Sequence, residues 1–263
     1  GPATLQRYLV SFQEFLKEMP QLKMKSATDI TSAEGTHHVW DLSVVEYLDY
    51  LFFCGRPKSD GVYLVASVKY HMPRVCAPLA HRALKGWDRL EPAQPREPLP
   101  WICVAAIAVE LLLMQQPLAA LATLLMFTMY LRPMELLEST IDQWTPPTSH
   151  LGGVYQLWVF TVRPVTSGKP AKNRLFDQSI ALDRPELAWI SEILVLLCQQ
   201  KPQAQMFAPV SSQFALLFKE ACVRVGISCL GPVPYSLRHG GVSHDIQERF
   251  RSLEQARLRG RWL

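Results

Sequence analysis

The sequence predicts a mainly α-helical protein with a small antiparallel β-sheet, divided into two domains. Three observations support this fold class. Apolar residues recur at helical spacing through most of the chain, a proline-rich stretch interrupts it at residues 88–100, and only residues 154–162 and 174–182 have the composition of strands. A length of 263 residues suits two domains at roughly 100–200 residues each.

Residues 1–87 are expected to form a compact domain of short helices. Ser43 and Glu46 have the spacing of a capping box that starts the second helix, and Gly55 is expected to end it. Two more helices are expected over residues 59–71 and 77–85, the latter ending before Gly86. The first helix is marked by an apolar stripe made of Leu5, Tyr8, Leu9, Phe12, Phe15 and Leu16.

Residues 88–100 contain four prolines and predict a stiff linker, so residues 101–263 form the second domain. This domain opens with two apolar segments separated at Gln115–Pro117. Each is shorter than the roughly 20 residues that a membrane-spanning helix needs, so we expect buried core helices and no membrane partner. Beyond them, and apart from the two strands, helices are expected at residues 133–139, 186–200, 212–225, 234–248 and 252–259.

The charge balance, the cysteine spacing and the absence of common motifs narrow the possible functions. With 27 basic and 23 acidic side chains, the net charge of +4 permits a nucleic-acid partner without arguing for one. The six cysteines show no metal-ligand spacing, which favours reduced thiols inside the cell. No phosphate-binding loop, dinucleotide fingerprint or zinc-protease motif occurs, so we expect no nucleotide cofactor and no metal.

Four short segments carry the functional signal. In order along the chain they are Tyr130–Leu137 (YLRPMELL), Gly168–Arg174 (GKPAKNR), Tyr235–His239 (YSLRH) and Arg259–Trp262 (RGRW). Each segment alone has an ordinary explanation: Arg132 could be a helix-end cation paired with Glu135, and residues 169–174 could be a solvated hairpin tip. Together, on a helix, a hairpin, a helix and a helix end, they resemble the motifs of tyrosine recombinases, the integrase family of site-specific DNA recombinases.

This resemblance implies a helical N-terminal core-binding domain that clamps DNA and an integrase-like catalytic domain. It also implies an activity in DNA recombination and DNA integration, as in mobile elements. A tyrosine hydroxyl attacks a DNA phosphate, forms a 3′-phosphotyrosyl intermediate and frees a 5′-hydroxyl, and a second 5′-hydroxyl reverses the step. The implied partners are double-stranded DNA and further copies of the protein, as a dimer or tetramer on DNA. The expected location is intracellular, with the DNA.

The resemblance assigns a role to each motif residue. Arg132 and Arg238 would place guanidinium groups on the non-bridging phosphate oxygens, where charge grows in the transition state. Lys169 would be the general acid for the leaving 5′-oxygen. Trp262 would donate a hydrogen bond through its indole N–H. Glu135 and His239 would support these groups.

The chain departs from the family pattern at two points. Tyr235 stands where the family usually has histidine or lysine; a phenol can donate a hydrogen bond to phosphate but is a poor base at neutral pH. We expect Tyr235 to act as such a donor; the alternatives are that His239 substitutes for it or that turnover is impaired. No tyrosine follows Tyr235 either, and the resemblance places the nucleophile beyond Leu263. The chain as written is therefore expected to bind DNA without cleaving it.

Local clusters of basic residues are the expected DNA contacts, because each phosphate contact releases counterions and makes binding sensitive to salt. They are Arg163, Lys172 and Arg174 on the hairpin, Arg259 and Arg261 near the end, and Lys58, Lys69, Arg74, Lys85 and Arg89 in the first domain.

Three other functions fit parts of the sequence. A catalytically inactive DNA-binding relic of a recombinase would explain Tyr235 and the absent nucleophile. A type IB topoisomerase shares the chemistry, and a helical protein-interaction module would use the apolar helices. The presence of Arg132, Lys169 and Arg238 together favours the recombinase.

Overall fold

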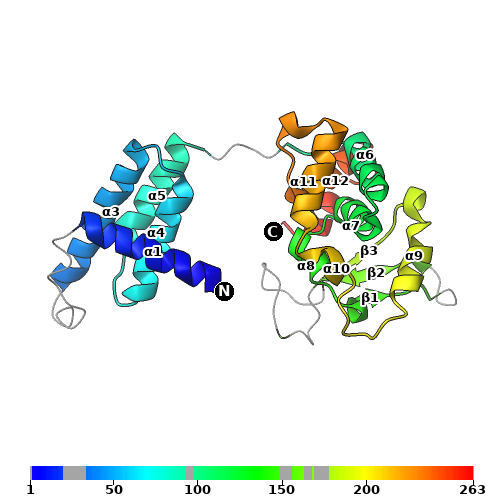
Figure 1. The fold of residues 1–263 in the computed structure, drawn as a ribbon, viewed down its shortest axis with the longest axis horizontal. Coiled ribbons are helices and arrows are strands. Elements are labelled where there is room, and N and C mark those ends of the chain that lie inside the picture. Colours follow the sequence, from blue (N-terminus) through cyan, green and yellow to red (C-terminus); the bar gives the residue numbers. More distant parts are fainter. Residues whose placement is uncertain are drawn as a thin grey trace. The chain divides into compact units, whose positions relative to one another are not determined.

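The computed structural model describes residues 2–19, 34–92, 97–148, 156–162, 168 and 178–262. It divides into two compact units, Gly1–Gln94 and Pro95–Leu263, and the division falls within the proline-rich stretch (Figure 1). As the sequence predicts, the described residues are mainly helical and include a small antiparallel sheet.

The N-terminal unit contains helices α1 (Pro2–Glu18), α3 (Glu34–Phe53), α4 (Lys58–His71) and α5 (Pro78–Leu90). Helix α1 packs on α4, and α3 packs on both α4 and α5. Their shared core is rich in aromatic side chains: Phe15 from α1 and Trp40 from α3 are almost fully buried, and Phe15 lies 6.2 Å from Trp40 and 5.4 Å from Tyr47 between ring centroids.

Two predicted helix boundaries in this unit are wrong. Helix α3 begins at Glu34, so Ser43 is a buried residue inside the helix and not its N-cap. Helix α5 continues through Gly86 to Leu90, because Trp87 is buried edge-on against Phe52 at 5.3 Å. Burying an aromatic side chain outweighs the roughly 1 kcal/mol that a helical glycine costs. Residues 88–90 are therefore helical and do not belong to an extended linker.

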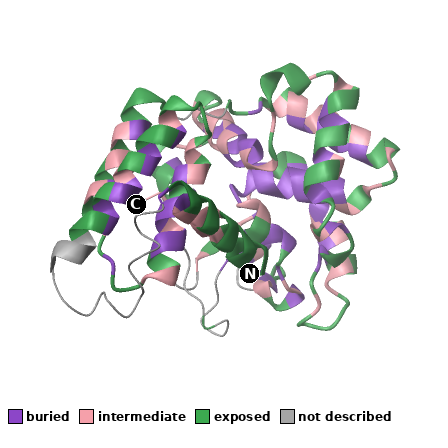
Figure 2. Cartoon of the chain, turned by 60° about the vertical axis from the view of Figure 1, so that its left-hand side comes forward, coloured by how far each residue is buried: buried purple, intermediate pink, exposed green. Residues whose placement is uncertain are grey.

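The C-terminal unit is built around helix α7 (Pro117–Thr128), which is buried from Ala119 to Thr128 (Figure 2). Helices α6 (Trp101–Leu113), α11 (Phe214–Val225) and α12 (Pro234–Gln247) pack against it. The remaining helices are α8 (Pro133–Leu137), α9 (Ile190–Leu197), α10 (Ala208–Ser211) and α13 (Leu253–Arg259), with 3-10 turns at Ile141–Gln143, Pro185–Leu187 and Ser228–Leu230. Among the described residues, no helix has the length and apolar character needed to cross a membrane.

The sheet has three antiparallel strands in the order β1 (Trp144–Thr145), β2 (Val159–Thr161) and β3 (Ser179–Ala181). Trp144, Phe160 and Ile180 pair across it and are buried. Strands β2 and β3 lie within the predicted strand segments. Strand β1 was not predicted, because two residues are too few to show alternation.

Two glycines let α12 approach its neighbours closely. A Cβ atom at Gly241 would lie 1.9 Å from the Phe127 carbonyl oxygen of α7, and one at Gly240 would lie 2.2 Å from the Leu99 carbonyl oxygen. A larger residue at either position would therefore push α12 outward. This contact positions the preceding turn of α12, which carries Tyr235 and Arg238.

Candidate functional site

Three segments that are far apart in the sequence meet at one carboxylate, that of Glu135 in α8. Its Oε1 atom accepts a 2.5 Å hydrogen bond from Arg132 Nη1, and its Oε2 atom accepts one of 2.5 Å from Arg261 Nη2. Arg238 Nη1 of α12 lies 3.8 Å from the same Oε2 atom. One carboxylate thus faces three guanidinium groups, which leaves an excess of two positive charges.

Local backbone structure explains how α8 presents its two residues. Arg132 is extended and precedes Pro133, which suits the first position of a helix. Glu135 Oε2 accepts from the Arg132 backbone N–H at 2.8 Å, so the carboxylate also caps the helix. Tyr130, which is fully buried, turns the chain from α7 towards α8 with a left-handed φ of 53°. This conformation is uncommon for a residue other than glycine.

Arg238 is enclosed. Its side chain is 0% exposed; Nη1 donates to the Tyr130 carbonyl oxygen at 2.7 Å, and Nη2 donates to that of Gly260. The Trp262 ring covers the guanidinium group, with 4.7 Å from Cζ to the ring centroid. Burial, with the nearby charges of Arg261 and Arg132, lowers the pKa of Arg238 to about 10, so it stays protonated at neutral pH.

The turn after α13 depends on a glycine. A Cβ atom at Gly260 would lie 1.6 Å from a Trp262 ring atom, although the φ of Gly260 is an ordinary −75°. Arg261 follows with a left-handed φ of 57°. The turn therefore folds the Trp262 ring back over Gly260 and onto Arg238. Trp262 contacts Arg238 through its ring face, and the hydrogen bond that the resemblance assigns to its indole N–H stays a prediction.

Tyr235 and His239 lie one turn apart on α12, with ring centroids 5.1 Å apart. The Tyr235 hydroxyl is close to Arg132. Burial lowers the pKa of Arg132, but the Glu135 carboxylate and the Tyr235 hydroxyl raise it by more, and the net pKa lies above its ordinary value. Arg132 side-chain atoms are 23% exposed, so this is the most accessible guanidinium group of the three.

The predicted hairpin residues Arg163, Lys169, Lys172 and Arg174 lie outside the described residues. Arg259 has internal partners: Nη2 donates to the Ala181 carbonyl oxygen at 2.8 Å and to Asp183 Oδ1 at 3.0 Å. Burial lowers its pKa to about 10. We therefore assign Arg259 to the scaffold and no longer expect it to contact DNA.

A buried ion-pair network, which sequence reasoning missed, supports the same region. Asp245 of α12 is fully buried and pairs with Arg184 and, at 2.8 Å, with Arg251. Arg251 also binds Asp183 at 2.6 Å. The network joins the end of α12 to the segment after β3. Its only sequence signal is the adjacent charged pair Asp183-Arg184, which does not reveal distant partners.

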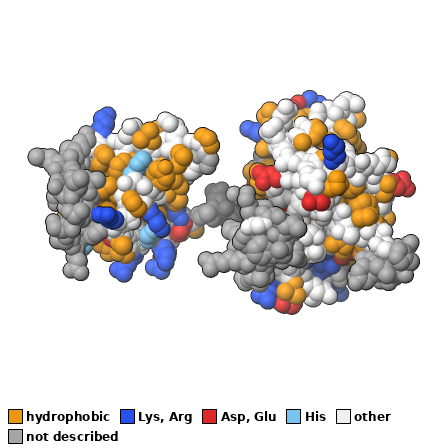
Figure 3. Space-filling view, turned by 90° about the horizontal axis from the view of Figure 1, so that it is seen from below, with side chains coloured by type: hydrophobic (Ala, Val, Ile, Leu, Met, Phe, Trp, Pro, Cys, Tyr) orange, Lys and Arg blue, Asp and Glu red, His pale blue; other side chains and the backbone are white. Residues whose placement is uncertain are grey.

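The five basic residues of the N-terminal unit that the sequence predicts as DNA contacts fall into two groups. Lys69, Arg74, Lys85 and Arg89 are exposed and have no ion pair within the described part of the chain. Lys58 pairs with Asp88, so its charge is locally compensated. Figure 3 shows several Lys and Arg side chains gathered along one side of this unit.

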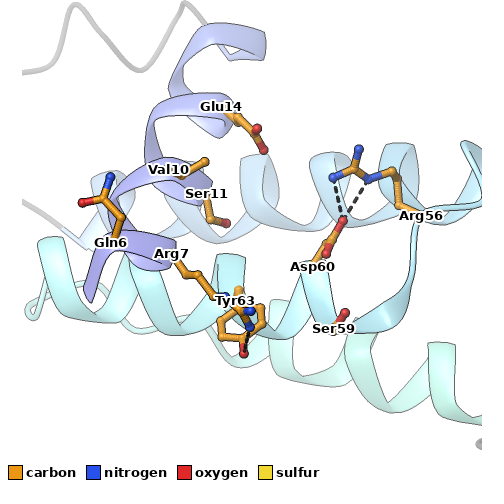
Figure 4. A pocket seen from close by; sticks show the side chains of 9 residues that line it. All are labelled: Gln6, Arg7, Val10, Ser11, Glu14, Arg56, Ser59, Asp60 and Tyr63. Atoms are coloured by element: carbon orange, nitrogen blue, oxygen red, sulfur yellow. Dashed lines mark hydrogen bonds and ion pairs between the residues drawn. The ribbon is translucent and has the colours of Figure 1, made fainter. Parts of the chain in front are cut away.

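A hollow of about 450 Å³ lies between α1 and the start of α4 (Figure 4). Arg7 donates to the Tyr63 hydroxyl at 2.9 Å, and Arg56 pairs with Asp60 at 2.7 Å. Glu14 also lines the hollow. Because its cations are partnered and two carboxylates are present, this hollow does not suit a phosphate. No group of His, Cys, Asp or Glu among the described residues is arranged to hold a metal ion.

No model of a known protein family matches the chain, and no curated protein matches it significantly.

Proposed function

We propose that this chain binds double-stranded DNA and acts in site-specific DNA recombination, with strands cleaved and rejoined through a 3′-phosphotyrosyl intermediate. The observation that carries the proposal is the convergence of Arg132, Arg238 and Arg261 on Glu135. Two of the motifs that resemble tyrosine recombinases supply Arg132 and Arg238, and a third supplies Arg261. The same three motifs also bring Tyr235 and Trp262 to the cluster.

The charge of this cluster suits phosphoryl transfer. A phosphodiester carries one negative charge, and the pentavalent transition state carries more on its non-bridging oxygens. Three guanidinium groups against one carboxylate leave an excess of two positive charges, which favours the more highly charged transition state. A guanidinium fork also fits two phosphate oxygens at once, which a lysine cannot reproduce.

The other roles complete the proposal. Tyr235 donates a hydrogen bond to a phosphate oxygen, and Lys169 protonates the leaving 5′-oxygen. None of the eight tyrosines of this sequence is assigned the role of nucleophile. The exposed cations Lys69, Arg74, Lys85 and Arg89 bind other backbone phosphates of the DNA.

An activated substrate tests the chemistry without requiring the nucleophile. The substrate is a nicked duplex that carries a 3′-p-nitrophenyl phosphate beside a 5′-hydroxyl, with randomised flanking sequence. The 5′-oxygen attacks phosphorus, the bond to p-nitrophenolate breaks with its electron pair, and the hydroxyl proton passes to water. We expect joined strands, whose sequencing also reveals the preferred site.

The matched variants are Arg132→Ala in the cluster and Arg224→Ala on α11. Arg224 pairs with exposed Glu220 and lies outside the cluster. Joining should fall by roughly 10²–10³-fold in Arg132→Ala, the usual cost of one transition-state donor, and should be unchanged in Arg224→Ala. Equal joining by Arg132→Ala and the unmodified chain would overturn the proposal.

A second candidate, DNA binding without strand transfer, is favoured by the enclosure of Arg238. Both of its Nη atoms have backbone acceptors, and the Trp262 ring covers it. An arginine held in this way could simply tie α12 to the two neighbouring turns. Salt-sensitive DNA binding with no joining on any sequence of the pool would establish this candidate.

A further inference from the structure

We propose that Arg261 is a third arginine that contacts the reacting phosphate, beside Arg132 and Arg238. The inference rests on the proposed function, because the anion it invokes is the DNA phosphodiester at that site. It extends the proposed function by naming a phosphate-binding residue that lies between Gly260 and Trp262.

The first observation is the state of the Arg261 guanidinium group. The side chain is 6% exposed, and Nη2 is held by Glu135. Its Nε and Nη1 atoms are also buried, yet neither has a hydrogen-bond partner among the described residues. The Nε atom of Arg238 is in the same condition. An unsatisfied buried donor destabilises the fold, and more so when it is charged, so these donors favour an added acceptor.

The second observation is the charge around Arg261. Burial, together with the charges of Arg132 and Arg259, lowers its pKa, and Glu135 offsets only part of this effect. Tyr235 acts in the same direction as Glu135 and raises the pKa of Arg261. The single carboxylate therefore leaves the repulsion among the arginines incompletely compensated. A bound anion would relieve that repulsion and supply acceptors for the unpaired donors.

The third observation is that the backbone holds Arg261 in place. Its left-handed φ of 57° follows the close contact between Gly260 and Trp262, and its N–H donates to the Leu258 carbonyl oxygen at 3.0 Å. Such a conformation is unfavourable for a residue other than glycine and persists only where the surroundings impose it. Arg259 differs at its Nη atoms, both of which have acceptors in the scaffold, although its Nε atom is also buried without a partner among the described residues.

The inference is tested by two measurements. In the joining assay, Arg261→Lys keeps one charge for Glu135 but loses the fork, and Arg261→Ala loses both. We expect joining to fall by roughly 10²-fold or more in each variant. The control is Arg257→Ala on the preceding helix, α13; the Arg257 side chain is 51% exposed and pairs only with Glu254 among the described residues. It should join at the unmodified rate.

The second measurement guards against loss of folding in the variants. The Nε–Hε signals of the unmodified chain are followed by NMR during titration with inorganic phosphate. The Arg261 signal should shift and saturate, and the Arg257 signal should not. If the unmodified chain and Arg261→Ala join equally well, or if the Arg261 signal does not move, the inference fails while the proposed function stands. If the unmodified chain does not join at all, the proposed function itself fails.

Discussion

Glu135 and Arg261 lie 126 positions apart, yet their side chains, 7% and 6% exposed, form an ion pair of 2.5 Å. The pair connects the first turn of α8 to the turn after α13. Because Glu135 also holds Arg132, a single carboxylate sets the positions of two guanidinium groups. In a buried pair, each charge depends on the other for compensation, so removing one partner is costly.

Replacing Glu135 with glutamine should therefore destabilise the C-terminal unit. Glu135→Gln leaves three guanidinium groups without a counter-charge, and breaking a buried pair costs about 3–5 kcal/mol. Urea unfolding followed by circular dichroism measures this loss. The control is Glu254→Gln, which breaks an exposed pair with Arg257 and should cost about 1 kcal/mol or less. Similar losses in the two variants would show that Glu135 does not organise the cluster.

Replacing Gly260 with alanine should displace Trp262 from Arg238, because the added methyl group would overlap the indole ring. The expected cost in stability is about 1–3 kcal/mol. The ¹⁹F signal of fluorotryptophan-labelled protein, assigned with Trp262→Phe, should move in the variant. Gly86→Ala is the matched control: its methyl group meets open space within α5 and should stabilise by about 0.5–1 kcal/mol. An unmoved Trp262 signal in Gly260→Ala would contradict this packing.

The salt dependence of DNA affinity should separate free cations from paired ones. Each phosphate contact contributes about 0.9 to the slope of log affinity against log salt concentration. Lys69→Ala, Lys85→Ala and Arg89→Ala should each lower the slope by about this amount. Lys58→Ala should leave it unchanged, because Lys58 already pairs with Asp88. Equal slopes for all four variants and the unmodified chain would exclude Lys69, Lys85 and Arg89 from the DNA interface.

His244 should make stability fall at mildly acidic pH. Its ring packs 5.6 Å from Phe127 and 6.2 Å from Trp101, and burial, followed by the charge of Arg184, lowers its pKa below 6.5. The unfolded chain therefore takes up a proton more readily, and stability decreases as pH falls from about 6.5 through the lowered pKa. Unfolding free energies at pH 7 and pH 5.5 should differ less in His244→Phe. An unchanged difference would show that the pKa of His244 is the same in the folded and unfolded chain, and would contradict this prediction.

Local sequence features agree with local structure at two helix starts. The helix predicted from residue 252 begins with Ser252 and Gln255 exchanging hydrogen bonds, and α7 begins at Pro117, where the sequence separates two apolar segments. The same logic failed at Ser43 and at Gly86. There, packing against other helices outweighed a capping pattern in one case and a weak helix former in the other.

The site shows the same limit. Motifs identified Arg132, Arg238 and Trp262, whereas the pairing of Glu135 with Arg261 depends on how α8 and α13 are brought together. Arg259 and Arg261 are also indistinguishable by local sequence, since both are arginines beside Gly260. Their partners differ because Arg259 has helical backbone angles and Arg261 has left-handed ones, so the two side chains point in different directions.

The central claim is that the arginine cluster activates a DNA phosphate. The most direct test compares the unmodified chain with Arg132→Lys in the rate of strand joining at the nick that carries the 3′-p-nitrophenyl phosphate. Our account predicts joining by the unmodified chain and a loss of roughly 10²–10³-fold in the variant, with DNA affinity nearly unchanged, because lysine keeps the charge but not the fork. Bound DNA that is never joined by the unmodified chain, or equal rates for the two proteins, would contradict it.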